Sequence, residues 1–135
     1  MTNSNSFTAP KEQVKLFLED LKSILGSKNC ELDILPKKST ESSSDPYTTE
    51  NTLLDLDYDT EDVKQELLNL TISDYIETMK DNRDENKPFF WVFEKIIQSK
   101  EVYIKVKVRD KNKQKVFCVS FYYARYQLKN CPFQL

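Results

Sequence analysis

The 135-residue sequence contains no histidine and only one glycine. Histidine is the side chain whose ordinary pKa lies closest to neutral pH, so its absence removes the most common acid–base group. Ser-His-Asp and Cys-His catalytic sites are excluded, as are metal sites with histidine ligands. Any catalysis must therefore use Tyr, Lys, Arg, Asp, Glu, Ser or Cys. The single glycine, Gly26, is expected at the C-terminal end of a helix.

Cysteines and long apolar segments are also scarce. The three cysteines, Cys30, Cys118 and Cys131, are odd in number and lack the paired spacing of a zinc site. We interpret them as reduced thiols and expect no metal and no cofactor. No run of about 18 apolar residues is present, so no membrane span is expected. The opening residues have neither the basic nor the apolar region of a secretory signal, and we expect a cytoplasmic protein.

Charge is divided unevenly along the chain. Residues 1–94 contain ten Lys or Arg and twenty Asp or Glu, whereas residues 95–135 contain ten Lys or Arg and two Asp or Glu. A basic segment of this kind favours a surface for a polyanion such as nucleic acid. Attraction between the two halves within the fold explains the same pattern. Charge alone leaves both interpretations open.

Hydrophobic periodicity predicts helices in the first part of the chain. Apolar residues recur at helical spacing in two segments, and a Ser/Thr-x-x-acid pattern at Thr71 favours a third, short helix. The predicted helices cover residues 10–26, 60–70 and 71–79. Residues 37–52 are rich in Ser, Thr and Asp and are expected to form a flexible loop. The basic pair Lys37 and Lys38 in this loop is interpreted as solvated charge.

Strand patterns dominate the second part of the chain. A short strand is expected at residues 30–36, and an exposed loop at residues 80–88 precedes three longer runs. These runs form an expected antiparallel meander and cover residues 89–98, 101–110 and 115–126. We therefore expect an α+β fold, with N-terminal helices packed on an antiparallel sheet formed mainly by the C-terminal half. The expected organisation is a disordered tail, residues 1–9, and a single domain, residues 10–135.

The strand at residues 101–110 has an unusual outer face. Val102, Ile104, Val106 and Val108 alternate with Tyr103, Lys105, Lys107 and Arg109, so one face is apolar and the other carries one tyrosine and three cations. In the last strand we expect Phe117, Val119, Phe121 and Tyr123 in the core, and Cys118, Ser120 and Tyr122 on the opposite face.

That arrangement would bring Tyr122 beside Tyr103 and Lys105. The rim of this surface would carry more cations, namely Lys107, Arg109, Arg125 and Lys129. Lys and Arg bind phosphates, and a tyrosine ring can stack on a base, so the surface favours nucleic-acid binding. The alternative is an edge strand that its lysines protect against aggregation.

Four segments occur in an order that resembles a known family. They are LDYD (56–59), LTISDYIETM (70–79), FWVFEKIIQSKEVYIKVKVRD (90–110) and KVFCVSFYYARYQLKNCPF (115–133). The ordered set is similar to the MqsR family, whose members are toxins of bacterial type II toxin–antitoxin pairs. The resemblance extends over nearly the whole chain except residues 39–52.

The resemblance implies a RelE-like ribonuclease fold and metal-independent cleavage of messenger RNA. In such enzymes the ribose 2′-hydroxyl attacks the adjacent phosphate, and an antitoxin protein neutralises the toxin. The implied partners are therefore RNA and a cognate antitoxin. The alternative is a catalytically inactive relative that binds protein or RNA, such as a phage-encoded inhibitor of a host nuclease or defence system.

Family positions can be transferred onto this sequence residue by residue. Tyr103 and Lys105 match the family's Val-Tyr-Ile/Leu-Lys strand, whereas Glu77, Val92 and Tyr122 fall where the family has Lys, Gln and a basic residue. We expect Tyr103 and Tyr122 to act as acid and base, and Lys105 to stabilise the phosphorane charge and to lower the pKa of Tyr103. The expected RNA-binding residues are Lys107, Arg109 and Arg125.

Overall fold

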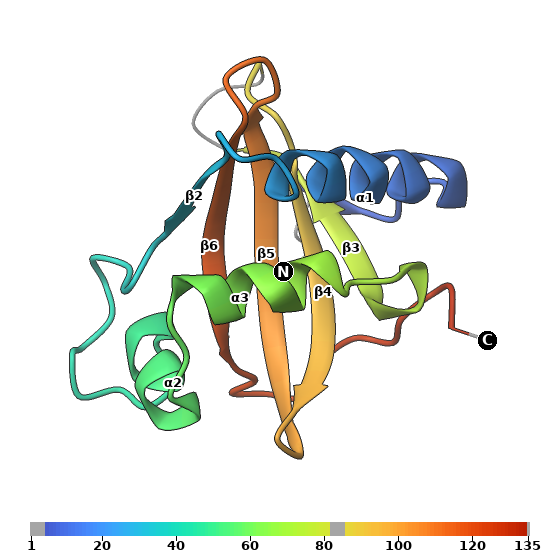
Figure 1. Ribbon diagram of the computed structural model, residues 1–135. Coiled ribbons are helices and arrows are strands. Elements are labelled where there is room, and N and C mark those ends of the chain that lie inside the picture. Colours follow the sequence, from blue (N-terminus) through green and yellow to red (C-terminus); the bar gives the residue numbers. More distant parts are fainter. Residues whose placement is uncertain (1–4, 82–85, 135) are drawn as a thin grey trace.

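A computed structural model describes residues 5–81 and 86–134. The α-helices lie against one face of a six-stranded sheet, which Figure 1 shows behind α1, α3 and α2. In chain order the elements are β1 (Ser6–Phe7), α1 (Lys11–Leu25), β2 (Glu31–Ile34), α2 (Thr49–Leu56), α3 (Thr60–Leu68), a 3₁₀ turn (Ile72–Asp74), β3 (Tyr75–Met79), β4 (Phe90–Ile97), β5 (Lys100–Asp110) and β6 (Lys115–Tyr123).

The strand order across the sheet is β1-β3-β4-β5-β6-β2. Strands β4, β5 and β6 form the antiparallel meander expected from the sequence, and β3 and β1 extend it antiparallel on one side. On the other side β2 pairs parallel to β6. The predicted α+β architecture, with helices on a mostly antiparallel sheet, is confirmed.

The core lies between the helices and β5. Val102, Ile104 and Val106 have no exposed surface, and they pack with the apolar stripe of α1. Phe17 of α1 stacks on Trp91 of β4, with ring centroids 4.7 Å apart. This burial fixes the direction of β5, so Tyr103, Lys105 and Lys107 project from the face of the sheet opposite the helices.

Helix α2 was not predicted from the sequence. It starts at Thr49, inside the segment expected to be a loop, and Thr48 caps it by accepting a hydrogen bond from the Asn51 amide. The Thr49 and Thr52 hydroxyls accept hydrogen bonds from the amides of Phe121 and Tyr123, at 3.0 and 3.1 Å. The helix therefore satisfies the edge of β6 beyond the short strand β2.

The predicted helix at residues 71–79 is wrong. A capping box between Thr71 and Asp74 is present, but it closes only one 3₁₀ turn before β3 starts at Tyr75. Tyr75 is fully buried, and its hydroxyl lies 2.6 Å from Thr78 Oγ1 and accepts a hydrogen bond from the Ala9 amide. Pairing with β4 and burial of this ring outweigh the local helix signal.

A β-bulge changes the expected faces of β6. Lys105 pairs with Ser120 while Val106 pairs with Cys118, so Val119 is the extra residue. As a result Cys118 lies in the core, and Phe117 lies on the outer face, where the guanidinium of Arg109 is 4.2 Å from its ring centroid. The sequence predicted the reverse for this pair because strict alternation assumes an unbroken register.

The structure describes the expected N-terminal tail and the expected loop at residues 80–88 only in part. In the predicted N-terminal tail, Ser6–Phe7 forms β1 and Phe7 packs edge-on against Phe89, whereas residues 1–4 lie outside the described residues. The expected loop at residues 80–88 includes residues 82–85, which are also outside the description. Within the described chain, no helix has the length and apolar character needed to cross a membrane.

Candidate functional site

The outer face of β5 and β6 brings two tyrosines together. Tyr103 and Tyr122 are directly opposite in the strand register, and their rings stack with centroids 5.3 Å apart and planes 12° from parallel. Tyr122 therefore lies beside Tyr103, as the sequence predicted. Ser120, fully buried, lies opposite Lys105 in the same register.

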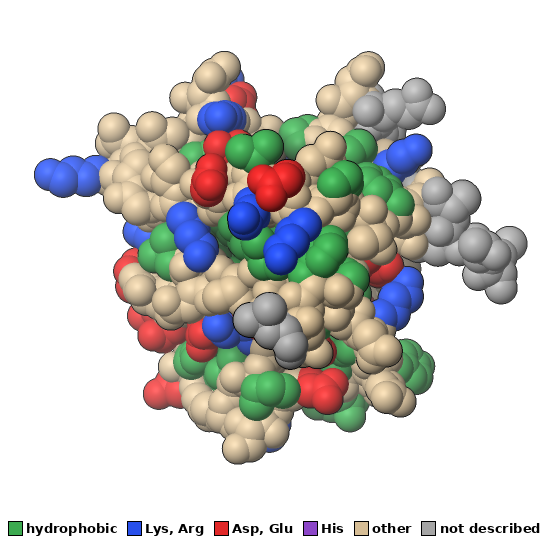
Figure 2. All heavy atoms as spheres, turned by 90° about the vertical axis from the view of Figure 1, so that its right-hand side faces the viewer, with side chains coloured by type: hydrophobic (Ala, Val, Ile, Leu, Met, Phe, Trp, Pro, Cys, Tyr) green, Lys and Arg blue, Asp and Glu red, His purple; other side chains and the backbone are tan. Residues whose placement is uncertain are grey.

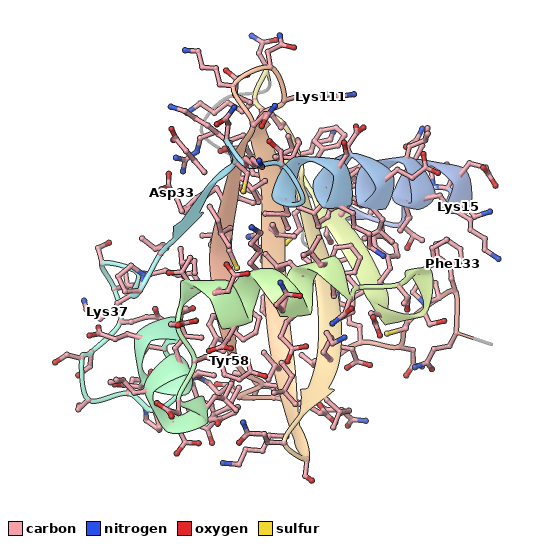
Figure 3. All side chains as sticks on the ribbon, viewed as in Figure 1. Lys15, Asp33, Lys37, Tyr58, Lys111 and Phe133 are labelled. Atoms are coloured by element: carbon pink, nitrogen blue, oxygen red, sulfur yellow. The ribbon has the colours of Figure 1, made fainter. Side chains whose placement is uncertain are left out.

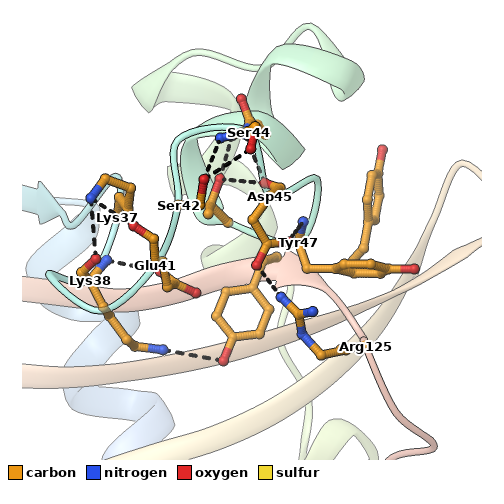
Figure 4. Close-up of polar contacts among 12 residues, drawn as sticks. Lys37, Lys38, Glu41, Ser42, Ser44, Asp45, Tyr47 and Arg125 are labelled. Atoms are coloured by element: carbon orange, nitrogen blue, oxygen red, sulfur yellow. Dashed lines mark hydrogen bonds and ion pairs between the residues drawn. The ribbon is translucent and has the colours of Figure 1, made fainter.

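A lysine from the loop before α2 joins this pair. Lys38 Nζ donates to the Ser120 and Tyr122 hydroxyl oxygens, each at 3.3 Å, and lies 4.8 Å from the Tyr122 ring centroid. Figure 4 shows Lys38 reaching from its loop toward the sheet, while Lys37 bonds to the loop itself. The interpretation of Lys38 as solvated charge is wrong, since its partners lie more than eighty positions later in the chain.

Lys105 lies next to these groups, and within the described residues its ammonium forms no ion pair with a carboxylate, although Glu77 and Asp81 lie close enough to influence its pKa. Its Nζ lies 4.8 Å from the ring centroid of Phe90. Burial lowers the pKa of Lys105, and Lys38 lowers it further, while Glu77 opposes the change. A larger fraction of this amine is therefore neutral near pH 7 than for an exposed lysine.

The pKa of the Tyr103 phenol changes in the direction opposite to the one expected from the sequence. Burial raises the pKa of its phenol, and Tyr122 and Glu77 raise it further. The expectation that Lys105 lowers the pKa of Tyr103 is wrong, because removal of the phenol from water and the neighbouring Tyr122 and Glu77 all raise it. The Tyr103 hydroxyl is thus a proton donor at neutral pH and a poor base.

Lys107 extends the same row but is buried. Its side chain is 3% exposed and forms an ion pair with Asp81 at 3.0 Å, and its Nζ also lies 4.4 Å from the Phe90 ring centroid. RNA contact by Lys107 stays a prediction, but a phosphate could reach this ammonium only if the buried pair opened.

The other two expected RNA-binding residues lie at opposite ends of the face. Arg109 pairs with Asp33 of β2 at 3.0 Å, near the top of β5. Arg125 follows β6, pairs with Asp45 and covers the ring of Tyr47 (Figure 4). Arg125 lines a small cavity together with Tyr103 and Tyr122, whereas Arg109 lies at the other end of the sheet face. Contact of either guanidinium with RNA stays a prediction.

Ion pairs between the two halves explain most of the uneven charge. Eight of the ten basic residues after position 94 pair with acidic residues before it, as in Lys111–Asp20 and Lys115–Glu31. Figure 2 likewise shows basic and acidic side chains interspersed on the face toward the N-terminal end of α1. The charge not paired in this way at the candidate site comes from Lys38 and Lys105.

The C-terminal segment, residues 124–134 after β6, covers part of the outer face. It passes behind β4 in Figure 1, and Cys131 packs on Ile76 and Val92, with Leu128 and Tyr103 alongside. Phe133, labelled in Figure 3, stacks on Tyr75 with ring centroids 5.8 Å apart. The family position occupied here by Val92 is consequently fully buried.

Glu77, at another family catalytic position, also contacts this segment. Its carboxylate accepts a hydrogen bond from Lys129 Nζ at 2.7 Å. Glu77 lies close enough to influence both Tyr103 and Lys105 electrostatically. The lysine of the C-terminal segment therefore offsets an acidic charge beside the site.

Burial makes two of the three cysteines poor nucleophiles. All three are free thiols, and burial raises the pKa of Cys118 to about 12 and that of Cys131 also to about 12. Both therefore stay protonated and weakly nucleophilic at neutral pH. Within residues 5–81 and 86–134, no three His, Cys, Asp or Glu side chains gather as a metal site would require.

Comparison with models of known protein families gives a match. A family model described as "Motility quorum-sensing regulator, toxin of MqsA" matches residues 29–122. A search of curated proteins finds no match. The matched segment contains Lys38, Tyr103, Lys105 and Tyr122, and it ends before Arg125 and the C-terminal segment.

Proposed function

The chain belongs to the MqsR toxin family, so it is the toxin of a toxin–antitoxin system, and we propose that it is an endoribonuclease that cleaves messenger RNA without a metal ion. The α+β fold is the RelE-like fold of this family. The observation that carries the proposal is the cluster of Lys38, Lys105, Tyr103 and Tyr122 on the outer face of β5 and β6.

The proposed reaction is attack of a ribose 2′-hydroxyl on the adjacent phosphorus. The neutral amine of Lys105 accepts the 2′-hydroxyl proton, and the new P–O2′ bond forms as the P–O5′ bond breaks. Tyr103 donates its phenolic proton to the leaving 5′-oxygen. The products are a 2′,3′-cyclic phosphate and a 5′-hydroxyl, and solvent returns the protons to their starting groups.

The directions of the pKa changes support this division of roles. Burial lowers the pKa of Lys105 and raises the pKa of Tyr103, so the amine is the better proton acceptor and the phenol the better donor. This assignment keeps Tyr103 as an acid–base group and exchanges the roles that the sequence suggested for Lys105 and Tyr122. Pairs of groups whose environments separate their pKa values are typical of acid–base catalysis.

Lys38 and Tyr122 stabilise the negative charge that develops on the non-bridging oxygens of the phosphorane. The Lys38 ammonium already lies 3.3 Å from the Tyr122 hydroxyl, so a phosphate oxygen can replace that contact with little rearrangement. Positioned cations and hydroxyls stabilise a transition state because they need not reorganise during the reaction. Arg109 and Arg125 are proposed to contact flanking nucleotides.

A second function is favoured by the covered family positions. Val92 is buried beneath the C-terminal segment, and Glu77 places an acid where the family has a lysine. A catalytically inactive relative that binds RNA or a protein partner would tolerate both features. In that case the chain would bind its antitoxin or RNA without cutting the RNA.

Cleavage of a long RNA in EDTA tests the proposal. The purified protein should cut the RNA at discrete positions, and addition of magnesium should leave the rate unchanged within about twofold, because only protein groups move protons in the scheme. We expect a neighbouring gene to encode the antitoxin, and addition of that antitoxin should suppress the cutting. Intact RNA both in EDTA and in magnesium would refute the ribonuclease proposal and favour the inactive relative.

A further inference from the structure

Two adjoining cavities lie beside the Tyr103–Tyr122 pair. The smaller, about 220 Å³, is lined by both of these tyrosines together with Tyr47 and Tyr126. The larger, about 1010 Å³, shares Tyr47, Arg125 and Tyr126 with the smaller one. We call the larger cavity the tyrosine groove. Because the two cavities share lining residues, a chain bound at the candidate site can extend into the tyrosine groove.

Tyr126 is the most exposed aromatic side chain of the groove. It is 79% exposed and follows β6 by three residues, so its ring adds nothing to the core. Tyr123, at the end of β6, also lines the groove, and Lys100 lies 4.7 Å from the centroid of its ring. An exposed ring beside other aromatic and cationic groups is typical of a platform for a nucleobase.

The opposite wall of the groove is held in place by an ion pair. Arg125 binds Asp45, and its guanidinium carbon lies 4.8 Å from the centroid of the Tyr47 ring. Asn51 Nδ2 donates to the Asp45 carbonyl at 2.8 Å, which fixes the loop that carries Tyr47. The aromatic wall is therefore preorganised, which reduces the entropy lost when a ligand binds.

Polar groups at the rim suit the edges of a base. Ser43, Ser44, Asn51 and Gln127 line the groove and offer both donors and acceptors. The volume is at the upper end of the range of roughly 300–1,000 Å³ for small-ligand sites, so the groove has room for a nucleobase with its sugar. Lys100 and Glu101 give the groove charges of both signs, which does not favour a ligand bound by charge alone.

We propose that the tyrosine groove binds an unpaired nucleobase of the RNA next to the scissile phosphate, stacked on Tyr126. This inference rests on the proposed function, because it places the flanking nucleotide of the same substrate. Arg125 and Tyr126 lie after residue 122, where the family match ends, whereas Tyr47 and Lys100 of the same groove lie within the matched segment.

The test uses a 2′-O-methyl oligonucleotide of mixed sequence, which can bind but cannot be cleaved through its 2′-oxygen. Fluorescence anisotropy of the labelled oligonucleotide gives the dissociation constant. Tyr126→Ala should weaken binding by about 5- to 100-fold, whereas Tyr126→Phe should bind within about twofold of wild type, because the ring alone stacks. Leu16→Ala, at an exposed apolar residue on α1, is the matched control and should not change binding.

Abasic substitution locates the stacked base. One abasic position in the oligonucleotide should weaken wild-type binding as much as Tyr126→Ala does, and the two changes should not add. Equal binding by wild type and Tyr126→Ala would overturn the inference, and so would loss of antitoxin binding with RNA binding intact. If Tyr126-dependent binding is found but no RNA is cut, the groove stands and the ribonuclease proposal fails.

Discussion

Lys105→Met is expected to slow RNA cleavage by about 100- to 10,000-fold, the usual cost of removing a positioned acid–base group. Methionine keeps the length of the side chain and its contact with Phe90 but cannot accept a proton. The folded protein should be unaffected, because Lys105 has no carboxylate ion pair within the described residues. Initial rates on a defined RNA, together with a urea unfolding curve for each protein, check both expectations.

The pH dependence of the same reaction identifies the role of Lys105. The amine accepts a proton only when neutral, so the wild-type rate should rise with pH until the pH exceeds the lowered pKa of Lys105. Lys105→Met should lose this rise. A lysine that acted only as a cation would give the opposite trend, since its charge is lost as the pH increases.

Two further variants test whether the loss of activity is specific to the candidate site. Tyr103→Phe keeps the ring that stacks on Tyr122 but removes the hydroxyl, so it should lose activity in the same range. Lys113→Met, at an exposed lysine in the β5–β6 turn, is the control and should cleave at the wild-type rate. If wild type and the two site variants all cut RNA at one shared rate, the activity belongs to another face or to a contaminating nuclease.

Lys107→Met is expected to destabilise the fold by about 3–5 kcal/mol, because it removes the cation beside a buried carboxylate. The Lys107 and Asp81 side chains are 3% and 2% exposed, so water cannot replace the lost ammonium without opening the structure. Chemical unfolding monitored by the fluorescence of Trp91 measures the change. The result separates a structural role for Lys107 from the RNA contact expected from its sequence position.

A double-mutant cycle of Lys107→Met, Asp81→Leu and the double variant gives the coupling between the two residues. Replacing a buried ion pair with apolar side chains is often close to neutral, so the double variant should be more stable than Lys107→Met alone. Lys113→Met again serves as the exposed control, with a change below about 0.5 kcal/mol. A Lys107→Met protein as stable as wild type would show that the buried pair contributes nothing to folding.

Much of the fold could be predicted because its signals are local. The apolar stripe of α1 and the alternation of Val102, Ile104 and Val106 each have one interpretation, and both are confirmed. Helix α2 gave no such signal, since its buried residues include Thr49 and Thr52, which bond to β6. Its position depends on a strand whose sequence begins more than sixty residues later.

The candidate site was predicted where it lies on one strand and missed where it depends on long-range contacts. Tyr103 and Lys105 follow from alternation within β5, and Tyr122 from pairing with β6. Lys38 could not be recognised, because only the folded loop brings it to Tyr122. The directions of the pKa changes of Tyr103 and Lys105 could not be predicted either, because they depend on burial that the sequence does not specify.

The role of the basic C-terminal third changes once its partners are known. Positive charge in residues 95–135 suggested either a polyanion surface or attraction between the two halves, and ion pairs such as Arg109–Asp33 and Lys115–Glu31 support the second. In the proposed function, the cations at the candidate site that stay available to bind RNA are Lys38 and Lys105. So few cations favour recognition by position and stacking over strong electrostatic binding.

The central claim is that a ribose 2′-hydroxyl attacks the phosphate at the Tyr103–Lys105 centre, and one substrate pair tests it most directly. The cleavage position is mapped on an RNA, and the same RNA is made with a single 2′-deoxy nucleotide on the 5′ side of that bond. The account predicts that wild type cuts the all-ribose RNA in EDTA, leaving a 2′,3′-cyclic phosphate and a 5′-hydroxyl, and leaves the deoxy-substituted bond intact. Cleavage of the deoxy-substituted bond at an equal rate, or products with 5′-phosphate ends, would contradict it.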